Sequence, residues 1–110
     1  MASSFRHSAG FGKRIEYWVV GLMLKAGLDV YLPLVDDDAI DAVIKLENGN
    51  FIEVQIKARS SDVVMGSGAF FAALKHEYRE NYWFVFYSER LNMIWILSSE
   101  ELIQESVKNK

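Results

Sequence analysis

The sequence contains no cysteine and only one proline, Pro33, among its 110 residues. Without cysteine the chain cannot form disulfides, cysteine-ligated zinc sites or a catalytic thiolate, and a reducing compartment suits it. It also lacks an apolar run of the roughly 20 residues that a membrane helix needs, and its first residues are too polar for a signal peptide. We therefore expect a cytoplasmic protein with no membrane segment.

Positively charged residues are also fewer than negatively charged ones. The sequence has 12 lysines and arginines and 15 aspartates and glutamates, which gives a formal net charge of -3. Proteins that bind duplexes through their phosphates are usually basic. A bound cation would offset part of the excess acid. A local basic rim remains available from Lys13, Arg14, Lys57, Arg59, Lys75 and Arg79.

Apolar residues, in contrast, make up 51% of the sequence. This share is enough for a compact core, while 110 residues are too few for two domains. We expect a single domain over residues 1–110, in which residues 1–11 form a flexible tail. The two histidines, His7 and His76, lie far apart in the sequence and show no ligand spacing.

The most informative segment is residues 39–59, AIDAVIKLENGNFIEVQIKAR, which predicts two strands joined by a turn. Successive residues of a strand point to opposite faces of the sheet. The second strand therefore has an apolar face, formed by Ile52, Val54, Ile56 and Ala58, and a polar face, formed by Glu53, Gln55, Lys57 and Arg59. The apolar faces are expected to form part of the core.

The register of this hairpin decides whether Asp41 meets the polar face. A two-residue turn at Asn48-Gly49 would set Asp41 opposite Ile56 and would mismatch the apolar faces. A three-residue turn with Gly49 in the left-handed conformation, together with a bulge, keeps the faces matched. We predict this second register, which places Asp41 directly opposite Gln55 and diagonal to Lys57.

A carboxylate, an amide oxygen and an ammonium group on one patch are suited to phosphodiester chemistry. Asp41, Gln55 and the backbone carbonyl of Ile56 offer the oxygen ligands that Mg²⁺ or Mn²⁺ accepts. Such a cation polarises a phosphate and acidifies a bound water. Lys57 would orient that water or stabilise the negative charge that develops.

The pattern of Asp41 followed by Gln55-Ile56-Lys57 on a hairpin, after a helix that carries Glu16, resembles the PD-(D/E)xK nuclease superfamily. The resemblance runs from about residue 12 to residue 97 and is strongest to Holliday-junction resolvases and small Q-x-K endonuclease domains. It implies a restriction-endonuclease-like α/β fold with an αβββαββα core, in which helices flank a mixed sheet. It also implies a metal-dependent endonuclease that acts on DNA, branched or structured DNA included, as a homodimer.

By this resemblance, Glu16 matches the first-helix acid that often holds metal through water, Asp41 the metal-binding aspartate, and Lys57 the motif lysine. Gln55 stands where the family usually has Asp or Glu, and a neutral amide is a weaker magnesium ligand. Relatives with intron-homing activity also use Q-x-K, so the change is compatible with cleavage. Additional candidates on the same polar face are Glu53 and Arg59.

Apolar spacing predicts the elements before the hairpin. Residues 15–26 have the periodicity of an amphipathic helix that ends at Gly27. Residues 30–34 predict a short strand edged by Pro33. The acidic run 36–38 is expected as a loop at the mouth of the site.

After the hairpin we expect a mobile loop over residues 59–71, which runs into a helix around residues 70–79. The apolar run 82–88 predicts a strand covered on both faces, and the run 93–98 predicts a similar neighbouring strand. Ser98 and Glu101 have the spacing of a capping box that opens a final helix.

Three functions follow from the sequence. The first is a metal-dependent endonuclease that hydrolyses DNA phosphodiester bonds. The second is a nuclease-fold domain that has lost cleavage through Gln55 and binds nucleic acid or protein. The third is an unrelated interaction domain, in which the polar face of the hairpin is an ordinary solvated surface with cross-strand charge pairs.

Overall fold

The computed structural model describes residues 10–35, 38–60 and 76–108, with side chains of the last helix up to residue 105. The elements in chain order are α2 (Phe11–Lys25), β1 (Asp29–Tyr31), β2 (Ala42–Lys45), β3 (Phe51–Arg59), β4 (Tyr82–Ser88), β5 (Met93–Ser98) and α4 (Ser99–Lys108). The strands form one sheet in the order β1-β2-β3-β4-β5. β3 and β4 pair in parallel, and the other neighbours are antiparallel.

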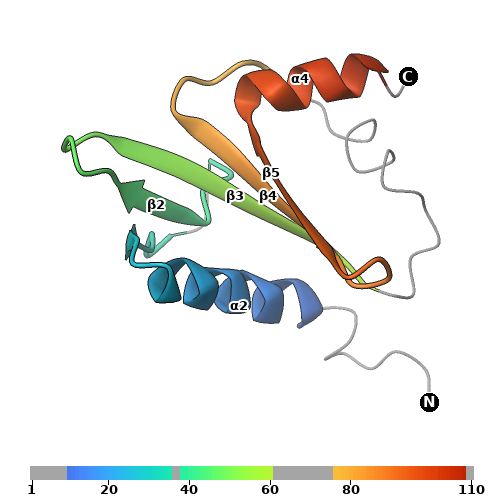
Figure 1. Ribbon diagram of the computed structural model, residues 1–110, viewed down its shortest axis with the longest axis horizontal. Coiled ribbons are helices and arrows are strands. Elements are labelled where there is room, and N and C mark those ends of the chain that lie inside the picture. The colour runs from blue at the N-terminus through green and yellow to red at the C-terminus, as the bar shows by residue number, and fades with distance from the viewer. Residues whose placement is uncertain (1–9, 36–37, 61–75, 109–110) are drawn as a thin grey trace.

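The sheet lies between the two helices, with α2 against one face and α4 against the other (Figure 1). The expected α/β fold with a mixed sheet flanked by helices is therefore confirmed. Neither helix in the described part of the chain is long and apolar enough to cross a membrane.

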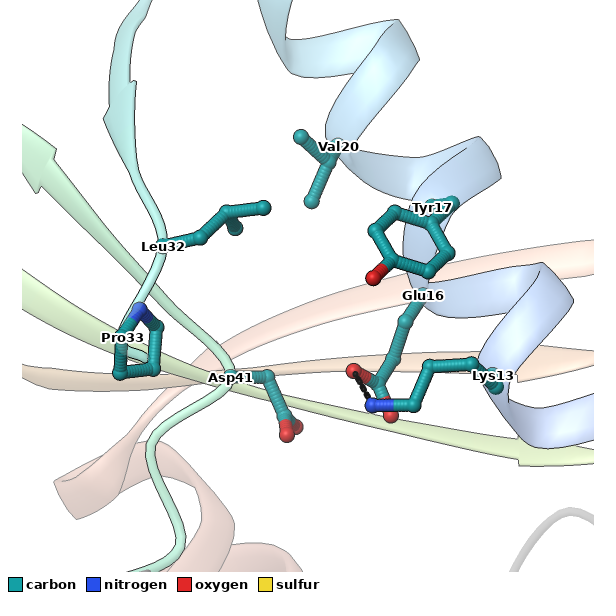
Figure 2. A pocket seen from close by; sticks show the side chains of 7 residues that line it. All are labelled: Lys13, Glu16, Tyr17, Val20, Leu32, Pro33 and Asp41. Carbon is teal, nitrogen blue, oxygen red and sulfur yellow. Dashed lines mark hydrogen bonds and ion pairs between the residues drawn. The ribbon is translucent and has the colours of Figure 1, made fainter. Parts of the chain in front are cut away.

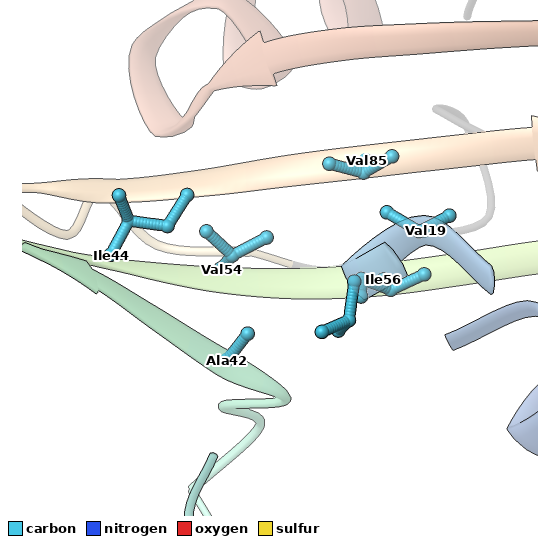
Figure 3. Close-up of a cluster of buried hydrophobic side chains, with 7 residues drawn as sticks. Val19, Ala42, Ile44, Val54, Ile56 and Val85 are labelled. Atoms are coloured by element: carbon cyan, nitrogen blue, oxygen red, sulfur yellow. The ribbon is translucent and has the colours of Figure 1, made fainter. Parts of the chain in front are cut away.

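Each face of the sheet carries its own buried cluster. On the α2 side, Val19 and Val20 of the helix pack against the strand residues Ala42, Ile44, Val54, Ile56 and Val85 (Figure 3). On the α4 side, Leu102 packs against Tyr82, Phe84 and Phe86. Since alternate residues of β4 point to opposite faces, this strand is covered on both sides as its apolar run predicts.

The β2–β3 hairpin has the predicted register. Ala42 lies opposite Val54, and Lys45 lies opposite Phe51. Asp41 precedes β2, and its backbone N–H donates to the Val54 carbonyl at 2.9 Å, so the predicted position of Asp41 directly opposite Gln55 is not part of the observed pairing. The three-residue turn is closed by a bond from the Gly49 N–H to the Leu46 carbonyl at 2.9 Å. Gly49 has a φ of 89°, the left-handed conformation that glycine adopts without steric cost.

The helix ends also follow the sequence. Past Lys25, the N–H groups of Gly27 and Leu28 donate to the carbonyls of Leu24 and Met23, and Gly27 has a φ of 89°. At the start of α4, the Ser98 N–H donates to Glu101 at 2.8 Å, and the Glu101 N–H donates to Ser98 Oγ at 3.2 Å. The predicted capping box is therefore confirmed.

Several boundaries differ from the prediction. Helix α2 begins at Phe11, inside the tail expected over residues 1–11, and residues 1–9 lie outside the described part. β1 ends at Tyr31, so the strand expected over residues 30–34 is too long, because Pro33 has no N–H for a ladder. Residues 36 and 37 of the acidic run also lie outside the described part.

Two tertiary expectations are wrong. β5 lies at an end of the described sheet and is largely exposed, with Ile96 at 65%, so it is not covered on both faces as β4 is. Residues 76–79 are not helical, because the Arg79 N–H donates across the molecule to Ser99 Oγ at 2.9 Å. The rest of the helix expected around residues 70–79 lies outside the described residues.

Candidate active site

A pocket opens between α2 and the chain that connects β1 to β2. Its lining residues are Lys13, Glu16, Tyr17, Val20, Leu32, Pro33 and Asp41 (Figure 2). The side chains of Glu16 and Asp41 extend into the same space from elements that are distant in the sequence. The fold thus brings together the helix acid and the hairpin acid.

Asp41 lies immediately before the first residue of β2. Its carboxylate oxygen Oδ2 accepts a hydrogen bond of 2.7 Å from the backbone N–H of Ile56 on β3. The side chain therefore accepts a bond that a strand carbonyl would otherwise accept, at the place where pairing between β2 and β3 ends. This bond orients the carboxylate along the open edge of β3.

The carbonyl of Ile56 lies on that same edge. In a strand, the N–H and C=O of one residue point toward the same neighbouring strand. Since the Ile56 N–H points to Asp41, its carbonyl oxygen also points to the β2 side of β3. The edge therefore offers a neutral oxygen close to the carboxylate.

Gln55 is held by Tyr82 of β4. The amide oxygen Oε1 of Gln55 lies 3.0 Å from the Tyr82 hydroxyl, which also donates to the carbonyl of Ala39. The Tyr82 side chain is only 2% exposed. One phenol group thus connects the loop before Asp41 to Gln55 of β3.

Lys57 and Arg59 follow Gln55 on the same face of β3. They pair with Phe86 and Ser88 in the parallel register with β4, and both are partly buried. Neither lines the pocket that contains Glu16 and Asp41. Lys57 is therefore close to Gln55 along the strand but is not part of the pocket. Glu16 enters the pocket from α2.

Glu53 is engaged by a cation. The Arg79 guanidinium lies 3.1 Å from Glu53 Oε1 and 3.4 Å from Asp38 Oδ2, and it donates to the Asp38 carbonyl at 3.1 Å. The same group stacks over the Tyr82 ring, 4.0 Å from its centroid. Through these contacts, Arg79 links the loop before Asp41 to Glu53 of β3 and Tyr82 of β4.

The sequence placed Lys13 only in a general basic rim and did not indicate Tyr17, yet both residues line the pocket. Lys13 Nζ lies 3.3 Å from Glu16 Oε1, and Tyr17 lines the same cavity. Residues three or four apart on a helix share one face. The spacing between Lys13 and Glu16 was therefore a signal that the lysine lies beside the acid.

Two groups near the site have shifted pKa values. Burial raises the pKa of the Tyr82 hydroxyl to about 12, Arg79 opposes the shift, and nearby carboxylates, Asp41 first among them, add to it. Burial and then the charge of Arg79 lower the pKa of His76 below its ordinary 6.5, against the smaller effect of Glu77. His76 stacks on the Tyr82 ring, and its Nε2 lies 2.6 Å from Ser99 Oγ.

The arrangement offers oxygen donors of two kinds. Among the described side chains, no three or more His, Cys, Asp or Glu residues form a group that could hold a metal ion. The carboxylates of Glu16 and Asp41 line the pocket, whereas Gln55 and Ile56, which carry neutral oxygens on the neighbouring strand, do not line it. Hard divalent cations accept carboxylate, amide and carbonyl oxygens and commonly retain water ligands, so this set fits Mg²⁺ or Mn²⁺.

The fold is a mixed α/β sheet flanked by helices. Among solved structures, the chain is similar to the bacterial homing endonuclease I-Ssp6803I, with a TM-score of 0.64 and 20% sequence identity. The similarity covers 88% of this chain and 72% of that chain. No protein-family model matches the sequence, and no curated protein matches it.

Proposed function

We propose that this chain is a metal-dependent endonuclease that hydrolyses DNA phosphodiester bonds. The observation that carries the proposal is the meeting of Glu16 and Asp41 in one pocket, with the Asp41 carboxylate bound to the backbone N–H of Ile56, the residue after Gln55. The shared fold with a homing endonuclease supports the same class of reaction. The Q-x-K pattern adds the resemblance to PD-(D/E)xK nucleases.

Asp41, Gln55 and the Ile56 carbonyl would hold the cation, with Glu16 bound to it directly or through water. When bound, Mg²⁺ or Mn²⁺ supplies charge that polarises the phosphate and lowers the pKa of a water molecule. The two carboxylates in the pocket repel each other, and a cation between them would relieve this repulsion. The Ile56 N–H holds Asp41 in place before any ligand arrives.

Lys57 would act on the substrate from the adjoining position on β3. Its ammonium group has three donors, which can hold the attacking water and a phosphate oxygen as negative charge develops. Lys13 would contribute a second positive charge at the pocket. Glu53 is engaged by Arg79, so we leave it out of the proposed ligand set.

The substrate that we propose is duplex DNA, including branched DNA. Cleavage of both strands requires one active site for each strand, so we also propose that the chain acts as a homodimer. The formal net charge of -3 confines phosphate contacts to the local basic groups near the site.

The test is nicking of supercoiled plasmid and cleavage of a synthetic four-way junction, with Mg²⁺, with Mn²⁺ and with chelator. Wild type is compared with Asp41→Asn and Lys57→Ala, and with Glu47→Gln, an exposed residue in the hairpin turn at the far end of β2. We expect metal-dependent cleavage by wild type and Glu47→Gln, and none by the other two. Cleavage that survives Asp41→Asn would contradict the proposal.

A second candidate function rests on the neutral side chain of Gln55. If the site lacks the charge needed to hold metal, the domain would bind branched DNA without cutting it. A gel-shift assay of folded wild type with four-way junction in chelator distinguishes this outcome, since binding with no cleavage in either metal would favour it.

A further inference from the structure

The Tyr82 hydroxyl contacts two oxygen atoms but has one hydrogen. It lies within hydrogen-bonding distance of the Ala39 carbonyl oxygen and 3.0 Å from Oε1 of Gln55. A carbonyl oxygen only accepts, and a phenol donates one hydrogen while its oxygen can also accept. The hydroxyl therefore cannot donate fully to both oxygens.

The terminal amide of Gln55 can resolve this conflict by a half-turn about its last bond. The turn exchanges the oxygen and the nitrogen, which are nearly the same size. The hydroxyl then donates to Ala39, and the Gln55 nitrogen donates to the phenol oxygen. In this arrangement, Oε1 faces away from Tyr82.

We propose that Tyr82 is a positioning residue that receives a hydrogen from the Gln55 amide nitrogen and thereby presents the amide oxygen to the cation. This inference rests on the proposed function for its cation and on the contacts of Tyr82 for its geometry. The phenol is well suited to the role because Arg79 and His76 both pack on its ring. Its hydroxyl is also anchored to the loop that carries Asp41.

The same contact accounts for a glutamine where related nucleases have an acid. The Tyr82 hydroxyl already donates its hydrogen to the Ala39 carbonyl. A carboxylate at position 55 would therefore face only the lone pairs of the phenol oxygen. It would repel that oxygen, or it would take the hydrogen and leave the Ala39 carbonyl without its donor. Tyr82 and Ala39 together therefore select a side chain that can both donate and accept.

The first test is a double-mutant cycle for folding, measured by urea unfolding without metal. Gln55→Glu is made in wild type and in the Tyr82→Phe background. The new charge at position 55 is common to both backgrounds, so its general repulsion cancels in the cycle. We expect Gln55→Glu to lower the folding equilibrium constant roughly tenfold more in wild type than in the Tyr82→Phe background.

The opposite sign would overturn the inference. If the Tyr82 hydroxyl donates to Gln55, a carboxylate would strengthen that bond, because hydrogen bonds to ionised acceptors are the stronger ones. Gln55→Glu would then be better tolerated in wild type than in the Tyr82→Phe background. The sign decides the geometry even if the protein binds no metal.

The second test is Mn²⁺ binding by the free protein, followed through the signal of unbound Mn²⁺ in electron paramagnetic resonance. We expect Tyr82→Phe to weaken binding about tenfold, the size typical of a group that orients a metal ligand. Tyr87→Phe, which removes a hydroxyl from the other face of β4, should leave binding unchanged. Equal affinities of wild type and Tyr82→Phe would overturn the positioning role.

Failure of the proposed function and failure of the role of Tyr82 give different results in these experiments. Wild type that binds no Mn²⁺ and cuts no DNA would refute the proposed function, and the cation half of the inference with it. Wild type that binds Mn²⁺ and loses binding in Asp41→Asn, but not in Tyr82→Phe, would refute only the role of Tyr82.

Discussion

Two substitutions can separate the structural role of Asp41 from the cation-binding role that we propose for it. Its carboxylate accepts from the Ile56 N–H at 2.7 Å and also lines the pocket with Glu16. Asp41→Asn keeps an oxygen acceptor for Ile56 and removes the charge. Asp41→Ala removes both, so the two variants should differ in stability and agree in activity.

The expected magnitudes follow from these contacts. A hydrogen bond to a charged acceptor contributes about 1.5–3 kcal/mol, and this one is only partly buried, so Asp41→Ala should lower the free energy of unfolding by about 1–2 kcal/mol. Asp41→Asn should change it by less than about 0.5 kcal/mol, because the lost charge also relieves repulsion with Glu16. Both should reduce cleavage at least ~100-fold, since a metal centre contributes several kcal/mol to the transition state.

The assay pairs urea unfolding without metal, followed by tryptophan fluorescence, with plasmid nicking in Mg²⁺. Glu47→Gln is the control for loss of one negative charge. Equal stability of wild type and Asp41→Ala would refute the argument that this carboxylate completes the sheet edge. Nicking by Asp41→Asn at the wild-type rate would refute its role at the cation.

Four further predictions concern residues that stabilise the fold. Ser99→Ala removes a buried oxygen that contacts His76 Nε2 and should cost about 1–3 kcal/mol at pH 7.5 in urea unfolding. Because the pKa of His76 is lowered in the folded chain, the unfolded chain takes up the proton first, so stability should fall as pH drops below 6.5. A titration of unfolding midpoints should lose this slope in His76→Gln. Gly49→Ala, at a φ of 89°, should cost about 1–2 kcal/mol, whereas Gly21→Ala, in open space on α2, should add about 0.5–1 kcal/mol. Leu102→Ala should cost about 2–5 kcal/mol by thermal unfolding, and a smaller loss would mean that α4 contributes little to the core.

The sequence predicted the hairpin register because two independent signals agreed. The apolar faces of β2 and β3 match in only one of the two registers considered, and Gly49 supplies the left-handed turn residue that this register needs. The ends of α2 and α4 were also predictable, since Gly27 and Ser98 act within one turn of the helix. These features depend on neighbours in the chain.

Features that depend on distant partners were not predictable. The apolar spacing through residue 78 favoured a helix, but residues 76–79 are not helical, and the bond from the Arg79 N–H to Ser99 gives the reason. The sequence of β5 is as apolar as that of β4, but apolar residues alone do not indicate whether one or both faces of a strand will be buried. Likewise, no local signal pairs Tyr82 with Gln55.

The parallel pairing of β3 with β4 has a consequence for the order of folding. The β2–β3 and β4–β5 hairpins join residues close in the sequence, whereas the β3–β4 ladder joins Glu53 to Tyr82 and so requires closure of a long loop. Loop closure of this kind slows folding, so we expect this ladder to form late. Since the contact between Tyr82 and Gln55 crosses that ladder, the proposed cation site would be completed only in the last step of folding, and a partly folded chain would not orient Gln55 for it.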